Sequence, residues 1–188
     1  MNERTGSTRL LNTRTGTVSP LPASSPCGGA GSCLFGDCVY VFGGHTGSAI
    51  NTSKKFDLKK KVWTEINSMP VTSCYNTASV ISGKIYVTGF HMPNVIAYDE
   101  KSNSFAVCLS LAVNTYKRLC EDWIVANGEL LKFCDGSFTK QGTHSLSLTN
   151  LLTSSTFKRN GFLYCIDGSL KLSRINTRSR SIELVEFQ

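Results

Sequence analysis

A hairpin pattern that recurs along the chain constrains the fold more than any other feature of the sequence. Two β-rich runs enclose a two-residue turn at Gly36-Asp37, and the same layout recurs around Ser82-Gly83, Asn127-Gly128 and Asn160-Gly161. Gly, Asn and Asp suit such turns because they tolerate the positive φ that a tight hairpin requires. The pattern therefore predicts four copies of one antiparallel unit, with residues 123–133 forming the first hairpin of the third copy.

A second spacing accompanies these hairpins. An apolar residue is followed by Asp or Asn, and a second apolar residue stands seven positions after the first. The spacing joins Leu11 to Val18, Phe56 to Trp63, Tyr98 to Phe105 and Ile175 to Ile182. An Asx-rich turn can hold the register of a hairpin while large side chains fill matched positions on its two strands. We therefore expect a second hairpin in each unit.

The distances between equivalent positions indicate the size of the repeat. Tyr40 and Tyr86 are 46 residues apart, Tyr86 and Leu130 are 44 apart, and Leu130 and Tyr164 are 34 apart. Two hairpins in about 45 residues make a four-stranded antiparallel unit, which is typical of a β-propeller blade.

The first unit resembles the kelch motif, which has a hydrophobic strand, a Gly-Gly doublet and a spaced aromatic pair. The second unit has Phe90 in place of the second glycine, and the fourth keeps mainly the spacing. The third has Phe133-Cys134-Asp135-Gly136 at the doublet, and no aromatic pair follows it. The residues that carry the resemblance, all expected to be structural, are Tyr40, Gly43, Gly44, Phe56, Asp57, Trp63, Tyr86, Gly89, Tyr98, Asp99 and Phe105.

The resemblance implies an all-β, kelch-type β-propeller that occupies residues 1–188 as one domain. We expect about four four-stranded antiparallel blades plus an N-terminal half blade. Both ends of the chain carry the same kind of hairpin, so neither end supplies the strands that the other lacks. We therefore expect an incomplete or open propeller, closed by self-association or by a partner. The expected units are a half blade at 8–26, blades at 27–72 and 73–115, a degenerate blade at 116–152 and a blade at 153–188.

The composition of the chain bears on its class and on the compartment in which we expect it. With 40% hydrophobic residues the chain has enough apolar surface for a core, which excludes a disordered tail. There is no run of 18 apolar residues, and residues 1–6 lack the apolar segment of a secretory signal, so we expect a cytoplasmic protein. The eight cysteines form no CxxC pair. We expect reduced thiols that pack as small apolar side chains, with disulfides or a metal as alternatives.

Basic residues recur at one structural position, the turn between the third and fourth strands of each blade. They account for part of the net charge of +7. Lysines there can solvate hairpin tips and discourage edge pairing, or they can bind an acidic or phosphate-bearing partner. Nucleic acid is not expected, because interleaved stacking aromatics are missing. The residues of this basic rim are Arg14, Lys59, Lys60, Lys61, Lys101, Arg178 and Arg180.

The opposite side of the propeller gathers the loops between second and third strands and those between blades. Polar and aromatic residues on such loops are candidates for contact with a protein partner. Two of the histidines could ligate a metal, but no third ligand accompanies them, so we expect no metal and no cofactor. The candidate loop-face residues are His45, Thr46, Ser48, Asn51, Tyr75, Asn76, His91, Asn94, Tyr116 and Arg118.

The function we expect is that of a protein-interaction scaffold, in which packed blades hold binding loops in place. One alternative is an enzyme, since kelch-fold proteins include sugar isomerases and copper-radical oxidases resembling galactose oxidase. No motif brings together the Tyr, His and Cys residues that the oxidase type needs, and we assign no catalytic residue. A second alternative is a cytoskeletal or other acidic partner that binds the basic rim.

Overall fold

The computed structural model describes residues 8–25, 27–90, 92–110, 117–126, 129–143, 155–166, 172–179 and 182–185. Regular structure in these residues consists of β-strands. None of the described residues belongs to a helix long and apolar enough to cross a membrane.

The strands form one hairpin and a series of four-stranded antiparallel sheets, each ordered as in the sequence. The hairpin pairs β1 (Thr8–Leu11) with β2 (Val18–Leu21). The first sheet contains β3 (Gly31–Phe35), β4 (Cys38–His45), β5 (Ala49–Asp57) and β6 (Val62–Ile66). The second contains β7 (Cys74–Ile81), β8 (Lys84–Phe90), β9 (Asn94–Asp99) and β10 (Ser104–Ser110).

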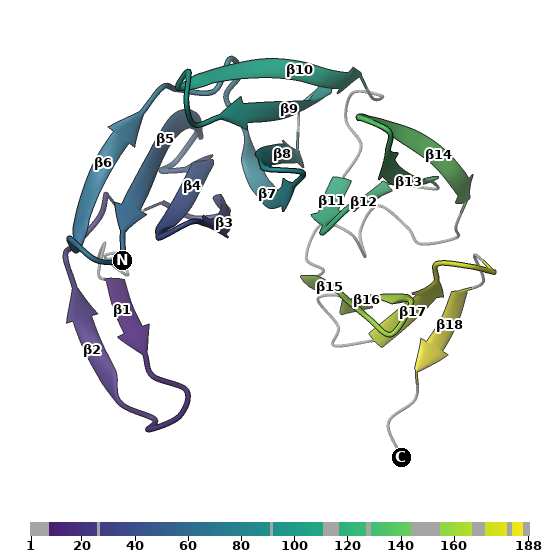
Figure 1. Ribbon diagram of the computed structural model, residues 1–188, viewed down its shortest axis with the longest axis horizontal. Helices are drawn as coiled ribbons and strands as arrows, with labels where there is room; N and C mark the ends of the chain where they lie inside the picture. The colour runs from purple at the N-terminus through teal and green to yellow at the C-terminus, as the bar shows by residue number, and fades with distance from the viewer. Residues whose placement is uncertain are drawn as a thin grey trace.

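The third sheet contains β11 (Lys117–Cys120), β12 (Trp123–Ala126), β13 (Glu129–Cys134) and β14 (Ser137–Thr143). The last sheet contains β15 (Ser155–Arg159), β16 (Phe162–Ile166), β17 (Leu172–Asn176) and β18 (Ile182–Val185). Figure 1 shows the sheets following one another around an open arc, with β1–β2 at one end and β15–β18 at the other. The prediction of antiparallel propeller blades plus a half blade, not closed into a ring, is confirmed.

The seven-residue spacing is confirmed as a hairpin register. Its two apolar residues are direct cross-strand partners in all four copies. The Asx side chain closes each turn, as where Asp57 Oδ1 accepts hydrogen bonds from the backbone N–H groups of Lys59 at 2.9 Å and Lys60 at 2.8 Å. Asn12, Asp99 and Asn176 accept equivalent bonds from the turn residues that follow them. This short-range chemistry explains why the hairpins recur despite weak sequence similarity.

The third repeat was misaligned by the sequence pattern. Residues 123–126 form the second strand of their sheet, not the first, because β11 precedes them and a turn at Glu121-Asp122 joins the two. Val125, not Leu130, therefore stands where Tyr40 stands in the first sheet. An aromatic pair is also present, since Phe133 lies opposite Phe138 across a shorter turn. A pair of β-rich runs around Asn-Gly marks a hairpin without saying which hairpin of the blade it is.

The core lies between neighbouring sheets. Tyr40 and Phe42 of the first sheet pack with Ile85, Val87 and Tyr98 of the second. Along a strand, successive side chains point to opposite faces. The residue after Ile85, Tyr86, accordingly faces the third sheet, where its ring centroid lies 5.2 Å from that of Phe133 and 5.6 Å from that of Phe138.

The junction of the third and last sheets follows the same arrangement with aliphatic side chains. Val125 and Leu130 pack there with Leu163 and Ile175, and each of these four side chains is fully buried. Burying a large apolar side chain contributes about 1.5–3 kcal/mol relative to leaving it in water. These contacts between sheets hold the arc together, because each sheet covers the apolar rows of its neighbours.

Candidate interaction surface at a blade junction

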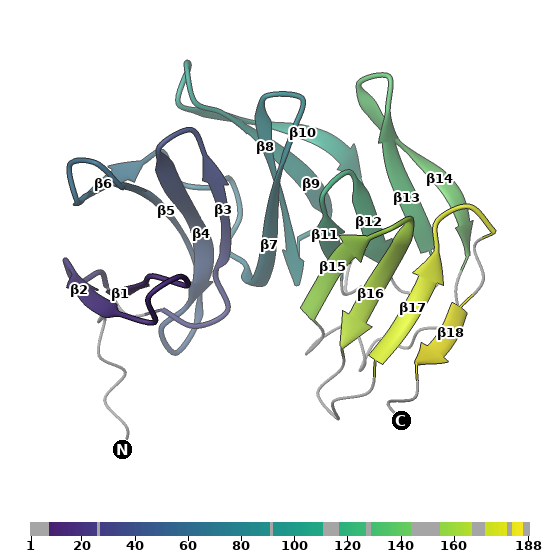
Figure 2. The same ribbon diagram turned by 60° about the horizontal axis from the view of Figure 1, so that its bottom comes forward.

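The hairpin turns and the connecting loops lie on opposite sides of the arc. Figure 2 shows the turns β7–β8, β9–β10 and β13–β14 along the upper side of the view. Strands alternate in direction within each sheet, so the loop of residues 46–48 between β4 and β5 leaves from the other side. We call that side the loop side and the first the turn side.

An aromatic pair stands on the loop side, where the first sheet meets the second. His45 ends β4 and Tyr75 lies near the start of β7, with ring centroids 5.8 Å apart and ring planes at 55°. Tyr75 is 40% exposed and His45 is half-buried. The backbone of His45 is fixed by paired hydrogen bonds with Gly28, of 2.8 and 3.0 Å. Two residues predicted for the loop face therefore meet.

Backbone geometry holds Tyr75 in an unusual conformation. Its φ is +52°, a left-handed value that costs a residue with a side chain on the order of 1–3 kcal/mol. The register of β7 against β8 shifts at this point, which marks a β-bulge between Cys74 and Thr77. The N–H of the next residue, Asn76, donates to the carbonyl of Gly29 at 3.0 Å. The surrounding strands thus determine where the tyrosine ring is presented.

Asn76 is not available to a partner, which corrects its place among the loop-face residues. It is only 5% exposed, and its Nδ2 donates to the carbonyls of Phe42 at 3.0 Å and Ser73 at 3.2 Å. A Cβ at Gly43 would lie 2.4 Å from Asn76 Nδ2, and one at Gly89 would lie 1.8 Å from its Oδ1. The amide therefore fills the space that two glycines of the kelch pattern leave open.

The other candidates divide into exposed and internally bonded residues. Thr46 and Ser48 are exposed in the turn after β4. Asn51 donates to the carbonyl of Met69 at 3.1 Å, and Asn94 accepts a hydrogen bond from Ser110 at 3.0 Å, so both amides support the fold. Arg118 lies within β11 rather than in a connecting loop. His91 and Tyr116 lie outside the described residues.

The basic rim contains acidic residues as well. Lys59 Nζ lies 2.5 Å from Asp37 Oδ2, in the other turn of the same sheet, and hydrogen bonding to this carboxylate raises the pKa of Lys59. The backbone N–H of Lys60 lowers the pKa of Asp57. Lys61, Lys101 and Arg178 also lie in turns between third and fourth strands, and Arg14 lies in the turn of the β1–β2 hairpin. Arg180 lies outside the described residues. Positive charge on this side is therefore interleaved with carboxylates.

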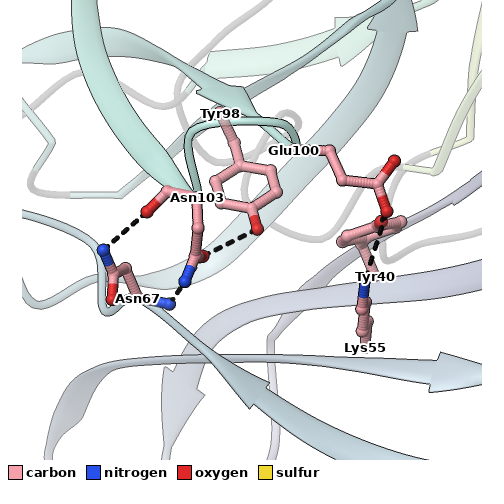
Figure 3. A network of polar contacts seen from close by, with 6 residues as sticks. All are labelled: Tyr40, Lys55, Asn67, Tyr98, Glu100 and Asn103. Carbon is pink, nitrogen blue, oxygen red and sulfur yellow. Dashed lines mark hydrogen bonds and ion pairs between the residues drawn. The ribbon is translucent and has the colours of Figure 1, made fainter.

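Polar contacts on the turn side join the first two sheets (Figure 3). The Tyr40 hydroxyl donates to Glu100 Oε1, and Lys55 Nζ lies 3.2 Å from the same oxygen. Burial and this hydrogen bond raise the pKa of Tyr40, and the bond lowers the pKa of Glu100. Sequence reasoning missed Glu100, because it occupies a hairpin turn and no local pattern shows that the turn reaches the next sheet.

Asn103 makes a second link at the same junction. Its Oδ1 accepts hydrogen bonds from the Tyr98 hydroxyl at 2.9 Å and from the backbone N–H of Asn67 at 3.0 Å. Its carbonyl accepts a bond from Asn67 Nδ2 at 2.5 Å. Figure 3 shows Asn67 reaching Asn103 from the neighbouring sheet. The junction that presents Tyr75 is thus fixed at both ends.

Among the described residues, no three His, Cys, Asp or Glu side chains lie close enough together to hold a metal ion. His91 lies outside these residues, so the predicted absence of a metal stays a prediction. Among the cysteines whose side chains the structure describes, the following form no disulfide: Cys27, Cys33, Cys38, Cys74, Cys108, Cys120 and Cys134.

The four-stranded antiparallel sheets resemble propeller blades. The first of them adds the features of the kelch motif, a glycine doublet beside the buried Asn76 amide and an aromatic pair across a turn that Asp57 closes. Residues 26–70, which contain the first sheet, match the kelch motif. A stretch of 75 residues, 39% of the chain, is 31% identical to Kelch-like protein 38 of Danio rerio. The resemblance to kelch repeats is therefore confirmed. The matched stretch spans 13% of that relative's length.

Proposed function

We propose that this chain is a protein-interaction scaffold that binds a protein partner on the loop side of the junction between its first two blades. The contact surface consists of His45, Thr46, Ser48 and Tyr75. The observation that carries the proposal is the His45–Tyr75 pair, in which a tyrosine 40% exposed is held at positive φ against a neighbouring ring.

Two physical arguments support this surface. Tyrosine is enriched among the residues that dominate binding energy, because its ring buries a large area while its hydroxyl can still form a hydrogen bond. A ring already fixed by its backbone loses little conformational freedom on binding, so more of the contact energy appears as affinity. Strained residues also cluster at functional sites.

Affinity capture with matched variants tests this proposal. Tyr75→Gly removes the ring and suits the positive φ, so the fold should persist, and Tyr75→Phe keeps the ring. We expect a partner captured by the unaltered chain to be retained by Tyr75→Phe and lost with Tyr75→Gly or His45→Ala. Lys60→Ala on the turn side is the control. Retention of every partner by Tyr75→Gly, with an unchanged melting temperature, would show that the surface is wrong.

A second candidate function is binding of an acidic partner on the basic rim, for which the supporting observation is that Lys60 and Lys61 are exposed beside Asp57. Such binding should weaken steeply as ionic strength rises, because exposed charges are screened within about 10 Å at 0.1 M salt. Binding through Tyr75 should change little over the same range. A salt titration of any captured partner therefore separates the two surfaces. The cytoplasmic location stays a prediction.

A further inference from the structure

The second sheet has an open outer edge, formed by β10. Among the described residues this strand pairs with β9 and with no other strand. Figure 1 shows β10 along the outer rim of the arc, with β7 of the same sheet toward the inside. The first and third sheets pack on the two faces of this sheet, so blades that precede or follow it do not cover its edge. An edge strand directs the N–H and C=O groups of alternate residues outward, where they can pair with another strand.

The composition of β10 differs from that of the other outer strands. Charged residues and proline on an edge strand hinder its pairing with a second chain. The other outer strands each contain one such residue: Pro20 in β2, Glu65 in β6, Lys140 in β14 and Glu183 in β18. The sequence of β10 is Ser-Phe-Ala-Val-Cys-Leu-Ser and contains none. This edge therefore lacks the residues that protect the others.

A β-bulge interrupts the second half of β10 and leaves the first half regular. The register against β9 is continuous from Ser104 to Val107 and shifts between Val107 and Leu109. Bulges themselves hinder edge pairing, because they bend and twist the strand. The regular stretch that is open to a second strand is therefore Ser104 to Val107, the half nearer the turn side.

Two apolar side chains lie on one face of this stretch. Phe105 packs against Phe42 of the first sheet and against Tyr98, with ring centroids 6.1 and 5.0 Å apart. Val107 lies opposite Ile96, which belongs to the same buried cluster as Phe42 and Tyr98, so Val107 faces the same way as Phe105. Val107 is nevertheless 59% exposed. The packing thus fixes Phe105 and leaves an apolar neighbour in solvent beside it.

We propose that two copies of this chain form a dimer by antiparallel pairing of their β10 strands, with Ala106 of one copy opposite Ala106 of the other. Residues opposite one another in an antiparallel pair point to the same face. Phe105 then lies opposite Val107 of the second copy, and the two-fold symmetry makes this contact twice. Pairs of an aromatic with a β-branched side chain stabilise sheets. Ala106 is exposed, and its small side chain lets the two backbones approach at the axis.

The residues of β10 favour a second copy over an unrelated strand. A two-fold contact requires the strand to complement itself, because each residue meets one from the same strand of the other copy. In this register the remaining pair is Ser104 with Cys108, and both residues are small and uncharged. One short strand pair buries less than the roughly 1,000 Å² of a stable interface, so we expect a weak dimer. The contact joins the rims of two arcs and closes neither.

Sedimentation of the full chain from about 1 μM to about 1 mM, the range in which weak dimers dissociate, tests the proposal. We expect dimers to appear with rising concentration and nothing larger, because a two-fold contact uses the same edge of both copies. Ala106→Lys places like charges opposite one another and should weaken association at least tenfold. The control Ser137→Lys adds the same charge to an exposed position of the outer strand β14 and should change nothing.

Melting temperatures show whether the variants remain folded, and Val107→Lys replaces Ala106→Lys should the latter melt early. A monomer throughout the concentration range would overturn the proposal. So would species larger than a dimer, or equal losses with Ala106→Lys and Ser137→Lys. All these changes lie away from the loop side, so their outcome is independent of partner capture by Tyr75.

Disulfide formation tests the register of the two strands. Opposite residues of an antiparallel pair have Cα atoms about 4.5–5.5 Å apart, a separation that a disulfide can span. In a common Cys108→Ser background, Ala106→Cys should yield a covalent dimer on mild oxidation. Ser110→Cys in that background should yield little, because the two copies of this residue lie far apart along the paired strands. Absence of the first product, or equal amounts of both, would contradict the proposed pairing.

Discussion

The hydroxyl of Tyr40, on the second strand of one blade, donates a hydrogen bond to the carboxylate of Glu100, in a turn of the next blade. Tyr40 is fully buried, whereas the Glu100 side chain is 41% exposed. This contact joins the first two sheets on the turn side of the molecule. The His45–Tyr75 pair lies at the same junction, on the loop side. Stability at this junction can therefore be tested by removing the contact.

Tyr40→Phe removes the hydroxyl and keeps the ring. We expect the free energy of unfolding to fall by about 1 kcal/mol, less than the roughly 1.5–3 kcal/mol of a buried hydrogen bond to a charged group, because Glu100 is partly solvated. Denaturant unfolding measures the change. Tyr164→Phe is the matched control, since it alters the same strand position in the last sheet. An equal loss in both variants would mean that the Glu100 contact contributes nothing specific.

The same contact makes part of the stability depend on pH. The Tyr40 hydrogen bond holds the pKa of Glu100 below its usual value of 4.5 in the folded chain. A lowered pKa contributes stability that is present above the usual value and is lost as pH falls through the folded value. We expect Glu100→Gln to flatten this part of the acid limb in unfolding curves measured from about pH 5 downward. Parallel curves for the two chains would contradict the assignment.

Gly89→Ala tests the packing of the glycine pattern around Asn76. The added Cβ would lie 1.8 Å from Asn76 Oδ1 and 2.7 Å from Ser73 Oγ, so buried polar groups must move. We expect a loss of roughly 2–3 kcal/mol in the free energy of unfolding. Gly83→Ala is the control, because its Cβ meets nothing within 4 Å and only its φ of +76° opposes the change.

A double-mutant cycle separates the clash from other effects. Asn76→Ala removes the obstructing amide at the expense of its own hydrogen bonds, so Gly89→Ala should cost clearly less in that background. Chemical unfolding of the four chains gives the coupling energy. Strict additivity would mean that Asn76 does not explain the glycine.

Cysteine labelling tests the expectation of inert thiols. Burial raises the pKa of Cys33 to about 12, and only the thiolate reacts with an alkylating agent. We expect Cys33 to react at least about a hundredfold more slowly at pH 8 in the folded chain than in the unfolded chain. Peptide mapping after a timed iodoacetamide pulse measures both rates, with the exposed Cys108 as internal reference. Equal folded and unfolded rates would contradict the raised pKa of the half-buried Cys33.

Much of the fold could be predicted from short-range patterns. The partnership of Phe56 with Trp63 and the Asx turn at Asp57 depend on residues within one hairpin, so spacing alone reveals them. The third blade shows where this reasoning stops. The Asn-Gly pair at residues 127–128 correctly predicted a hairpin between β12 and β13. The position of this hairpin within the blade depends on β11, and the turn after β11, at Glu121-Asp122, contains no Asn-Gly or similar pair that would have revealed it.

The candidate site, too, could be predicted from the sequence only in part. Tyr75 and His45 could be named from their positions after strands, whereas the burial of Asn76 could not, because it requires Gly43 and Gly89 from two different sheets to approach one amide. Hairpin pairing follows from the chain's local chemistry, since turn and register involve neighbouring residues. Which face of a strand meets which neighbour, and so which side chains stay exposed, is decided only when the sheets pack together, because those contacts join residues far apart in sequence.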